Sequence, residues 1–300
     1  MASKDSLGDR MKENYENRFK FKLLRRTPVI VRIDGKAFHS FTRGFNKPFD
    51  KVLSNAMDKT MQQLCENIQG CVFGYTQSDE ITLILNDYKS LDSSAWFDNE
   101  VQKICSVSAS MATAYFNRNF QKEVYDFYDI FISGTYSPNS EEEEDKFKNF
   151  ELLLKAYSIP NYDKALDLYE KYSNAIDKMA MFDARCFNIP ESEVANCVIF
   201  RQKDATRNSI EMVGRTYFSD KELHKKNCSN IQDMLMTVHN VNWNDFPVRY
   251  KRGCACHKVA MCTGDGEIVY HKWFIDYNMP IITQDREYVE KWVKLAENTK

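Results

Sequence analysis

The sequence lacks any long uninterrupted apolar run. No window of its 300 residues approaches the roughly 18 consecutive apolar residues of a membrane-spanning helix, so we expect no membrane partner. The N-terminal segment mixes charges of both signs and has neither the apolar core of a secretory signal nor the acid-poor composition of a transit peptide. Glycine (10) and proline (7) are scarce, which argues against long disordered stretches. These absences predict a folded intracellular protein, in the cytoplasm or, as the alternative, in the mitochondrion.

An excess of one charge is also missing. Lysine and arginine (41) nearly balance aspartate and glutamate (43), for a net charge of −2, so a nucleic-acid partner would have to be bound by local basic patches. Apolar residues make up 43% of the chain, which is enough for a sizeable core. The length predicts about two domains, or one domain with a large insertion.

The cysteines follow the pattern of free thiols. Their number is odd (9), and most lie in apolar segments. One dense group, Cys254, Cys256, His257 and Cys262, could be half of a zinc site. It lacks the C-x₂₋₄-C spacing and the second ligand pair of a structural zinc site, so packing within a strand is the favoured interpretation.

Hydrophobic periodicity predicts an α+β fold. A β-branched strand at 28–34 precedes a helix at 50–68, two strands flank Ser78-Asp79, and a helix rich in small residues and then another strand follow. The two strands that flank this turn are 71–77 and 80–85, the helix rich in small residues is 95–116, and the last strand is 181–189. The order β-α-β-β-α-β is that of the ferredoxin-like split βαβ unit, with an antiparallel sheet and helices on one face.

The rest of the chain divides around this unit. We expect a core domain over 1–120 and 177–215, interrupted by a helical insertion at 121–176. The insertion contains an acidic run (141–145) and two helical stretches, near 141–157 and 161–179. The C-terminal region, 216–300, is expected to pack on the core as an α/β segment, with a strand pair near 252–261 and 267–275 split by a turn at 263–266.

Two carboxylates fall at the ends of neighbouring predicted strands. Asp34 ends the first strand and Asp79 lies at the hairpin tip, and the split βαβ order places these strands side by side. Each aspartate alone is typical of an ordinary turn. Together they would repel unless a cation lies between them, and Mg²⁺ is the simplest candidate. Two such ions about 3.5–4 Å apart would support an in-line displacement at phosphorus.

The loop after Asp34 suits a phosphate. Gly35 allows a close backbone approach and can offer its carbonyl to a metal, and the amides of residues 36–39 can form an anion-binding nest. Lys36, His39 and Lys47 can add charged contacts to phosphate oxygens.

The motif set resembles a known family. The motifs are Arg32-x-Asp34-Gly35-x-x-Phe38-His39-x-Phe41-Thr42, Lys47-Pro48, Tyr75-x-Gln77-Ser78-Asp79-Glu80, Phe182-Asp183-x-Arg185 and Arg201-Gln202-x-Asp204-x-x-x-Asn208. Over nearly the whole chain except about 121–176, they resemble the tRNA(His) guanylyltransferase superfamily. Its members are 3′–5′ RNA polymerases with a polymerase-type palm domain.

The resemblance implies a role for each matching residue. Asp34, Asp79 and the carbonyl of Gly35 would bind two Mg²⁺ ions, and Ser78 and Lys47 would join the two aspartates in catalysis. The implied nucleotide site consists of Asp34, Gly35, Lys36, Ala37, Phe38, His39, Lys47, Ser78 and Asp79. ATP would activate a 5′-monophosphate end of tRNA, and GTP or another nucleoside triphosphate would then be added. The resemblance also implies a homotetramer.

One departure indicates the branch of the family. Members that add the extra G to histidine tRNA carry a His-Ile-Asn-Asn segment after the Arg-Gln-x-Asp motif, and here Thr206 stands where that histidine would fall. The sequence therefore resembles the guanylyltransferase-like branch, which repairs truncated tRNA 5′ ends by copying a template. Non-templated addition of G to histidine tRNA is the alternative, and a non-catalytic RNA- or nucleotide-binding protein is an alternative of another class.

Basic residues in several short groups fit an RNA partner. Each group alone is also typical of a solvated surface. As a set they would supply phosphate contacts to tRNA. The candidates are the basic residues Arg25, Arg26, Arg201, Lys203, Arg207, Lys251 and Arg252, together with the polar residue Asn208.

Overall fold

One antiparallel six-stranded sheet forms the centre of the protein. The computed structural model describes residues 6–90, 92–132, 151–262 and 268–294. The strand order across the sheet is β4-β1-β3-β2-β5-β6. The strands are β1 (Val29–Gly35), β2 (Cys71–Gln77), β3 (Glu80–Leu85), β4 (Phe182–Asn188), β5 (Cys254–Cys262) and β6 (Ile268–Asp276).

The first four strands form the expected split βαβ unit. The first crossover helix, α3 (Lys51–Asn67), connects β1 to β2, and the second, α4 (Val101–Phe131), connects β3 to β4. Helix α3 begins where predicted because the Asp50 side chain accepts a hydrogen bond from the backbone N–H of Leu53 and so caps the helix. The order β4-β1-β3-β2 confirms the ferredoxin-like prediction.

Helix α4 differs from the predicted 95–116. A short 3₁₀ turn, η2 (Trp96–Asn99), replaces its expected start, and the helix continues to Phe131. Buried side chains along its last turns, including Val124 and Phe127, keep it packed beyond residue 120. Residues 121–131, which were expected to begin an insertion, are therefore continuous with this helix.

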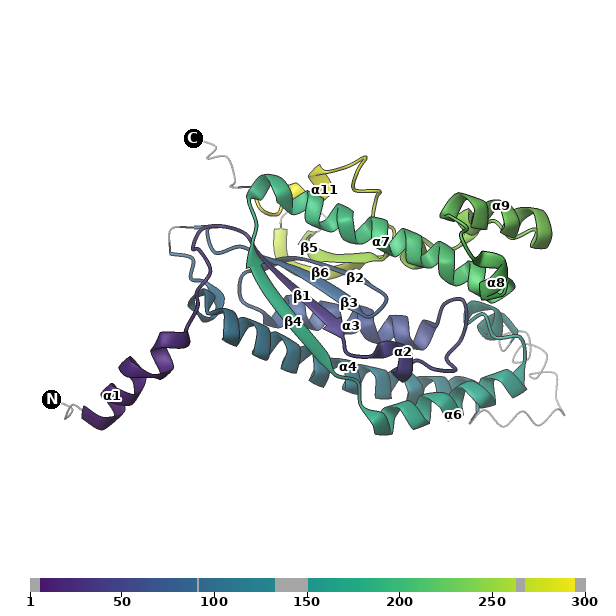
Figure 1. Cartoon of the computed structure of the whole chain (residues 1–300), viewed down its shortest axis with the longest axis horizontal. Coiled ribbons are helices and arrows are strands. Elements are labelled where there is room, and N and C mark those ends of the chain that lie inside the picture. Colours follow the sequence, from purple (N-terminus) through teal and green to yellow (C-terminus); the bar gives the residue numbers. More distant parts are fainter. Residues whose placement is uncertain (1–5, 91, 133–150, 263–267, 295–300) are drawn as a thin grey trace.

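Helices cover both faces of the sheet (Figure 1). Val31 and Ile33 of β1 point into the core shared with α3 and α4, whereas Ile30 points into a second core with α7 (Glu191–Tyr217). The sequence prediction placed helices on one face only. Burial on both faces explains why every residue of β3 is buried, because neither set of alternating side chains faces water.

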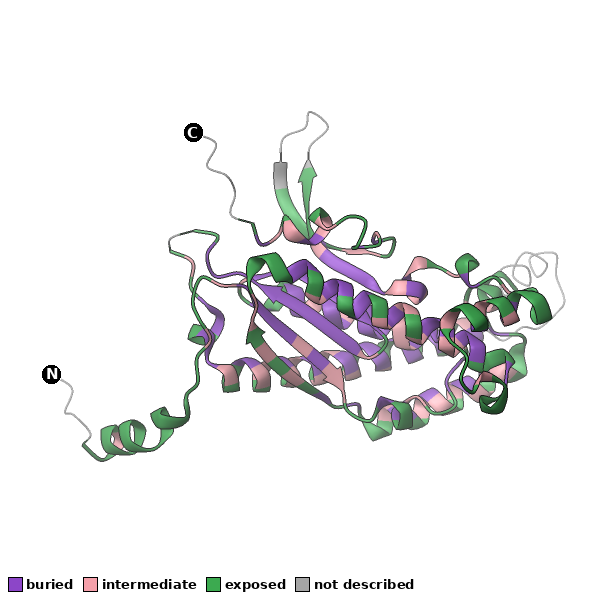
Figure 2. Ribbon diagram, turned by 45° about the horizontal axis from the view of Figure 1, so that its top comes forward, coloured by how far each residue is buried: buried purple, intermediate pink, exposed green. Residues whose placement is uncertain are grey.

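Strand β4 is an edge strand with one open face. Burial alternates along it, with Asp183 and Arg185 exposed and their neighbours Phe182 and Ala184 at least half-buried (Figure 2). Because side chains alternate across a strand, the two exposed residues lie on the same face of the sheet as Ile30.

The segment between α4 and β4 is helical where the structure describes it. Residues 151–156 are helical, and α6 (Tyr162–Lys178) begins after the cap Asn161, close to the predicted 161–179. The acidic run 141–145 and most of the predicted helix 141–157 lie outside the described residues. Tyr172 of α6 is buried and contributes to the site described below.

The C-terminal region completes the sheet. The predicted strand pair is confirmed as β5 and β6, and β5 pairs with β2, while the predicted turn 263–266 lies outside the described residues. The smaller elements are α1 (Ser6–Asn14), η1 (Glu16–Phe19), α2 (Phe38–Phe41), α8 (Asp220–Leu223), α9 (Cys228–His239), η3 (Trp243–Asp245), α10 (Val248–Arg252) and α11 (Glu287–Glu290).

Across the described ranges, none of the helices combines the length and apolar character needed to cross a bilayer.

Candidate active site

The two predicted carboxylates lie at the same end of the sheet. Strands β1 and β3 are antiparallel neighbours, and Asp34 lies opposite Glu80, the residue after Asp79. The backbone N–H of Gly35 donates a hydrogen bond to the carbonyl oxygen of Asp79 (3.1 Å). This bond places the Asp34-Gly35 strand end directly beside the Asp79 turn.

The turn between β2 and β3 is tight and presents Asp79. Ser78 has a positive φ of 50°, and its hydroxyl donates to Asp79 Oδ1 (3.0 Å). Burial raises the pKa of the Asp79 carboxyl, and the nearby Asp34 raises this pKa further, while the Ser78 hydrogen bond lowers it. A second carboxylate beside Asp79 makes its ionised form less favourable, and a cation bound between the two would relieve this.

Gly35 is required for packing as well as for access. A Cβ added at Gly35 would lie 2.5 Å from Phe38 Cε2 and 2.8 Å from Phe38 Cγ, and closer still to Phe38 Cδ2. The Phe38 ring is buried and packs against Phe116 and Phe182. The ring therefore lies directly under the strand end and supports the loop that follows Asp34.

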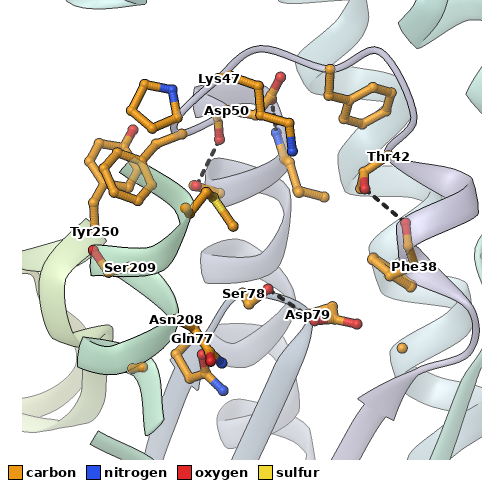
Figure 3. Close-up of a pocket in the computed structure, with 18 of the residues that line it drawn as sticks. Phe38, Thr42, Lys47, Asp50, Gln77, Ser78, Asp79, Asn208, Ser209 and Tyr250 are labelled. Atoms are coloured by element: carbon orange, nitrogen blue, oxygen red, sulfur yellow. Dashed lines mark hydrogen bonds between the residues drawn. The ribbon is translucent and has the colours of Figure 1, made fainter. Parts of the chain in front are cut away.

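A cavity of about 510 Å³ opens beside this turn. Figure 3 shows Ser78 and Asp79 with the loop of Phe38 and Thr42 on one side and Asn208 on the other. The lining residues come from four segments of the chain: the loop and helix start 35–54, the turn 77–79, the α7 residues Ala205, Asn208, Ser209 and Met212, and Arg249, Tyr250 and Gly253.

The loop predicted to bind phosphate turns sharply after Asp34 and Gly35. Ala37 has a positive φ of 54° and precedes the short helix α2, whose first amides have no acceptor within the helix. The amide of Lys36, which was expected to join the nest, instead donates to the carbonyl of Met181 (2.8 Å), so the predicted nest would have to use the amides of residues 37–39. The side chains of His39 and Lys47 are exposed and line the cavity.

Several residues that line the cavity were not predicted from the sequence to belong to the site. Asp50 is buried and accepts hydrogen bonds from the N–H groups of Leu53 (2.8 Å) and Asn46 (2.9 Å) and from the Tyr172 hydroxyl (2.6 Å). Burial raises its pKa, and these hydrogen bonds lower it. In the sequence Asp50 was visible only as a helix start.

An aromatic pair forms another wall. The rings of Phe49 and Tyr250 are stacked, with centroids 4.7 Å apart and an interplanar angle of 4°. Tyr250 is held there by its neighbour Arg249, whose guanidinium forms a buried ion pair with Asp58 of α3 (2.6 Å). The only sequence signal for this wall was an aromatic residue among basic ones.

The candidates for RNA binding, seven basic residues and Asn208, differ in how far they are buried. Arg25, Arg26, Lys203 and Arg207 are exposed, Asn208 lines the cavity and Arg252 is half-buried. Arg201 and Lys251 are buried: Arg201 pairs with Glu80, and the ammonium group of Lys251 donates to the carbonyl of Asn244. The prediction of RNA contact is therefore corrected for these two, because their charged groups are enclosed and already paired.

The site offers two carboxylates to a metal, which suits magnesium. In the described parts of the chain, no group of three or more His, Cys, Asp or Glu side chains is arranged to hold a metal ion. Mg²⁺ does not need one, because it commonly binds one or two protein carboxylates together with water and substrate phosphates. Cys254 and Cys256 are buried, and the Cys254 thiol donates to Asp58 Oδ1 (3.2 Å), which agrees with packing rather than with zinc binding.

Comparison with known proteins agrees with this geometry. The sequence model of the family described as tRNAHis guanylyltransferase matches residues 8–190. A protein of Acanthamoeba polyphaga mimivirus is 27% identical over 269 residues, which cover 86% of this chain and 79% of the relative. A probable tRNA(His) guanylyltransferase of Dictyostelium discoideum is 25% identical, with 79% and 77% of the two chains covered.

Two solved structures are also similar. A bacterial tRNA(His) guanylyltransferase (Thg1)-like protein in complex with ATP is 40% identical, with a TM-score of 0.72 over 97% of this chain and all of that chain. The tRNA(His) guanylyltransferase of Saccharomyces cerevisiae aligns with a TM-score of 0.54 and 19% identity, over 81% of this chain and 92% of that chain, and shares the fold.

Proposed function

This chain belongs to the tRNAHis guanylyltransferase family, and we propose that it repairs truncated tRNA by copying the opposing strand while adding nucleotides in the 3′–5′ direction. As a family member it is a nucleotidyltransferase that adds nucleotides to the 5′ end of tRNA and uses nucleoside triphosphates as substrates. The proposal concerns the choice of nucleotide: a template base, rather than a fixed preference for G, would select it.

The residue that carries this proposal is Thr206 of α7. It stands where the branch that adds G to histidine tRNA has a histidine, and it cannot carry a positive charge or donate from a ring nitrogen. Its neighbours Ala205 and Asn208 line the cavity beside Asp79, so a change at this point of α7 would lie close to a nucleotide bound in that cavity. The similarity to a bacterial Thg1-like protein supports the same branch.

The reaction that we propose has two displacements at phosphorus. An oxygen of the tRNA 5′-monophosphate attacks the α-phosphorus of ATP, and pyrophosphate leaves. The 3′-hydroxyl of the incoming nucleoside triphosphate then attacks the activated 5′-phosphorus, and AMP leaves. The amides of residues 37–39 and the side chains of Lys47 and Ser78 would bind phosphate oxygens and align them for attack.

We further propose that Asp34, Asp79 and the carbonyl of Gly35 hold two Mg²⁺ ions. The two carboxylates lie at one end of the sheet with the cavity alongside, and this placement supports the assignment. Bound there, the ions would neutralise charge that develops on the phosphates. The remaining ligands would be water and substrate oxygens.

A 5′-extension assay tests the templating. A tRNA that lacks its first nucleotide is supplied with each nucleoside triphosphate in turn, and the opposing base on the 3′ strand is then changed. We expect the added nucleotide to follow the opposing base, and Asp79→Asn to serve as the inactive control. Addition of G whatever the opposing base, or only to histidine tRNA, would instead establish the non-templated reaction.

We also propose a homotetramer acting inside the cell. Figure 1 shows α1 extending away from the body of the protein. Large apolar side chains of the segment 6–24, which includes α1, are exposed, as expected of a surface that another subunit covers. The eight cysteines whose side chains the structure describes are free, which fits a reducing compartment. Light scattering at micromolar concentration would measure the mass, and a monomer would contradict the assembly.

A further inference from the structure

A buried ion pair lies directly behind the proposed metal site. Glu80 is the residue after Asp79, and both of its carboxylate oxygens accept from the guanidinium of Arg201 on α7, at 2.6 Å each. Glu80 is 5% exposed and Arg201 8% exposed. A third hydrogen bond, from Arg201 Nη2 to Asp204 Oδ2 (3.1 Å), holds the guanidinium against rotation. This is a bidentate arginine–carboxylate ion pair, in which two parallel hydrogen bonds add to the charge attraction.

Without this arginine, the end of the sheet would carry a third carboxylate that no cation hydrogen-bonds. Asp34 lies opposite Glu80 in the β1–β3 register, so both side chains are on the same face, and Asp79 is the adjacent residue. The other cation near Glu80 is Arg32, whose Nε lies 3.8 Å from Glu80 Oε2, too far for a hydrogen bond. Of these two cations, Arg201 is therefore the one that hydrogen-bonds the Glu80 carboxylate, and Arg32 adds a longer ion pair.

The pair also anchors the metal-binding turn. The backbone carbonyl of Glu80 accepts a hydrogen bond from the hydroxyl of Thr76 on β2 (2.8 Å), and its side chain is tied to α7. The Ser78-Asp79 turn therefore lies between Thr76 and Glu80, which are hydrogen-bonded to each other. A shift of Glu80 toward Asp34 would also move the turn, because Glu80 directly follows Asp79 in the chain.

We propose that Arg201 is a positioning residue: by pairing with Glu80 it excludes this carboxylate from the metal site and leaves Asp34 and Asp79 as the metal-binding carboxylates. This inference rests on the proposed function, in which those aspartates bind Mg²⁺. Metal coordination positions then stay open for substrate phosphates. A third carboxylate would bind the metal more tightly but would occupy a position that a phosphate needs.

Binding of Mn²⁺ to the nucleotide-free protein tests this without turnover. Electron paramagnetic resonance measures the free ion as the metal is titrated into the full-length chain. For Arg201→Gln we expect Mn²⁺ to bind about tenfold more tightly, because the released Glu80 carboxylate adds negative charge and an oxygen ligand. We expect tRNA extension to fall at the same time. An anchor with only a structural role would not tighten metal binding.

Three further variants give the test an internal order. Glu80→Gln removes one of the two carboxylate partners of Arg201 and leaves Asp204, so the net charge beside the aspartates becomes more positive and Mn²⁺ binding should weaken. The double variant Glu80→Gln with Arg201→Gln removes both charges and should return the Mn²⁺ affinity to within about threefold of the original protein. Lys59→Gln is the matched control, because it removes a cation from another buried glutamate, Glu123, on the face covered by α3 and α4. Circular dichroism melts show which variants are folded.

The outcomes separate the inference from the proposed function. Equal Mn²⁺ affinities in the original protein, the Arg201→Gln variant and the double variant would overturn the positioning role. If Arg201→Gln fails to fold, Glu80→Gln and the double variant still decide, and identical affinities in these two would overturn it. Failure of Asp79→Asn to weaken Mn²⁺ binding would instead contradict the metal site itself.

Discussion

Replacement of Gly35 by alanine would move the loop after Asp34 relative to the metal-binding turn. The new Cβ would lie 2.5 Å from Phe38 Cε2, whereas ordinary van der Waals contact begins near 3.4 Å, so the ring or the strand end must move by about 1 Å. The Phe38 ring has little freedom, because it is buried against Phe116 and Phe182. Overpacking of this kind costs about 1–3 kcal/mol of folding stability.

The larger effect should be on activity. A displacement near 1 Å between reacting groups can lower a rate by about 100-fold. The assay is single-turnover extension of a truncated tRNA with saturating nucleotide, corrected for the folded fraction measured by urea unfolding.

Gly74→Ala is the matched control. A Cβ at Gly74 would lie 2.5 Å from Cys65 Sγ, so this variant is also overpacked, but on the α3 face of β2 and outside the cavity lining. Both variants should lose similar stability, and only Gly35→Ala should lose most of its extension rate. If the two rates agree within about twofold, the argument that Gly35 acts through the position of the loop is refuted.

Three other results are expected. Asp79→Asn should lower extension by several orders of magnitude and leave tRNA binding within about threefold in a filter assay, because the charge acts on phosphoryl transfer; extension near the original rate would contradict the metal assignment. Arg249→Met should cost about 3–5 kcal/mol in urea unfolding, because it leaves the buried Asp58 carboxylate without its cation; a loss below about 1 kcal/mol would show that water reaches this pair. Tyr172→Phe should raise the pKa of Asp50 further above 3.8, because the Tyr172 hydroxyl stabilises the ionised carboxylate and the variant lacks it. Carbon NMR of labelled aspartate would measure this pKa. An unchanged or lowered pKa of Asp50 in the variant would contradict this reasoning. Because the folded-state pKa of Asp50 is raised, its contribution to stability is fully present below pH 3.8 and is lost as the pH rises through the folded-state pKa.

Local patterns predicted the strands around the site well. Strands β2 and β3 begin and end at the predicted residues, and the Ser78-Asp79 turn between them is as expected. The reason is that alternating apolar residues and a two-residue turn are properties of adjacent positions. The proximity of Asp34 to Asp79 also followed from sequence, because the split βαβ order admits few pairings of β1.

Long-range contacts were not predictable in the same way. Arg201 resembled a surface cation in the sequence, but α7 covers the sheet and buries it against Glu80, a partner 121 residues away. Arg249 similarly finds Asp58 across 191 residues. Nothing in the spacing of a single charged residue indicates which distant carboxylate will neutralise it.

The sequence alone determined the order of strands and helices, the free thiols and the two aspartates at one end of the sheet, since these depend on local periodicity and on the few topologies that a β-α-β-β-α-β order allows. Only the tertiary structure decided that both faces of the sheet are covered, that Asp50 and the Phe49–Tyr250 stack line the cavity, and that Glu80 is neutralised by Arg201. The physical reason is that burial and charge pairing depend on which surfaces meet after folding. A formal charge of −2 is a sum over the chain, whereas function depends on where those charges lie.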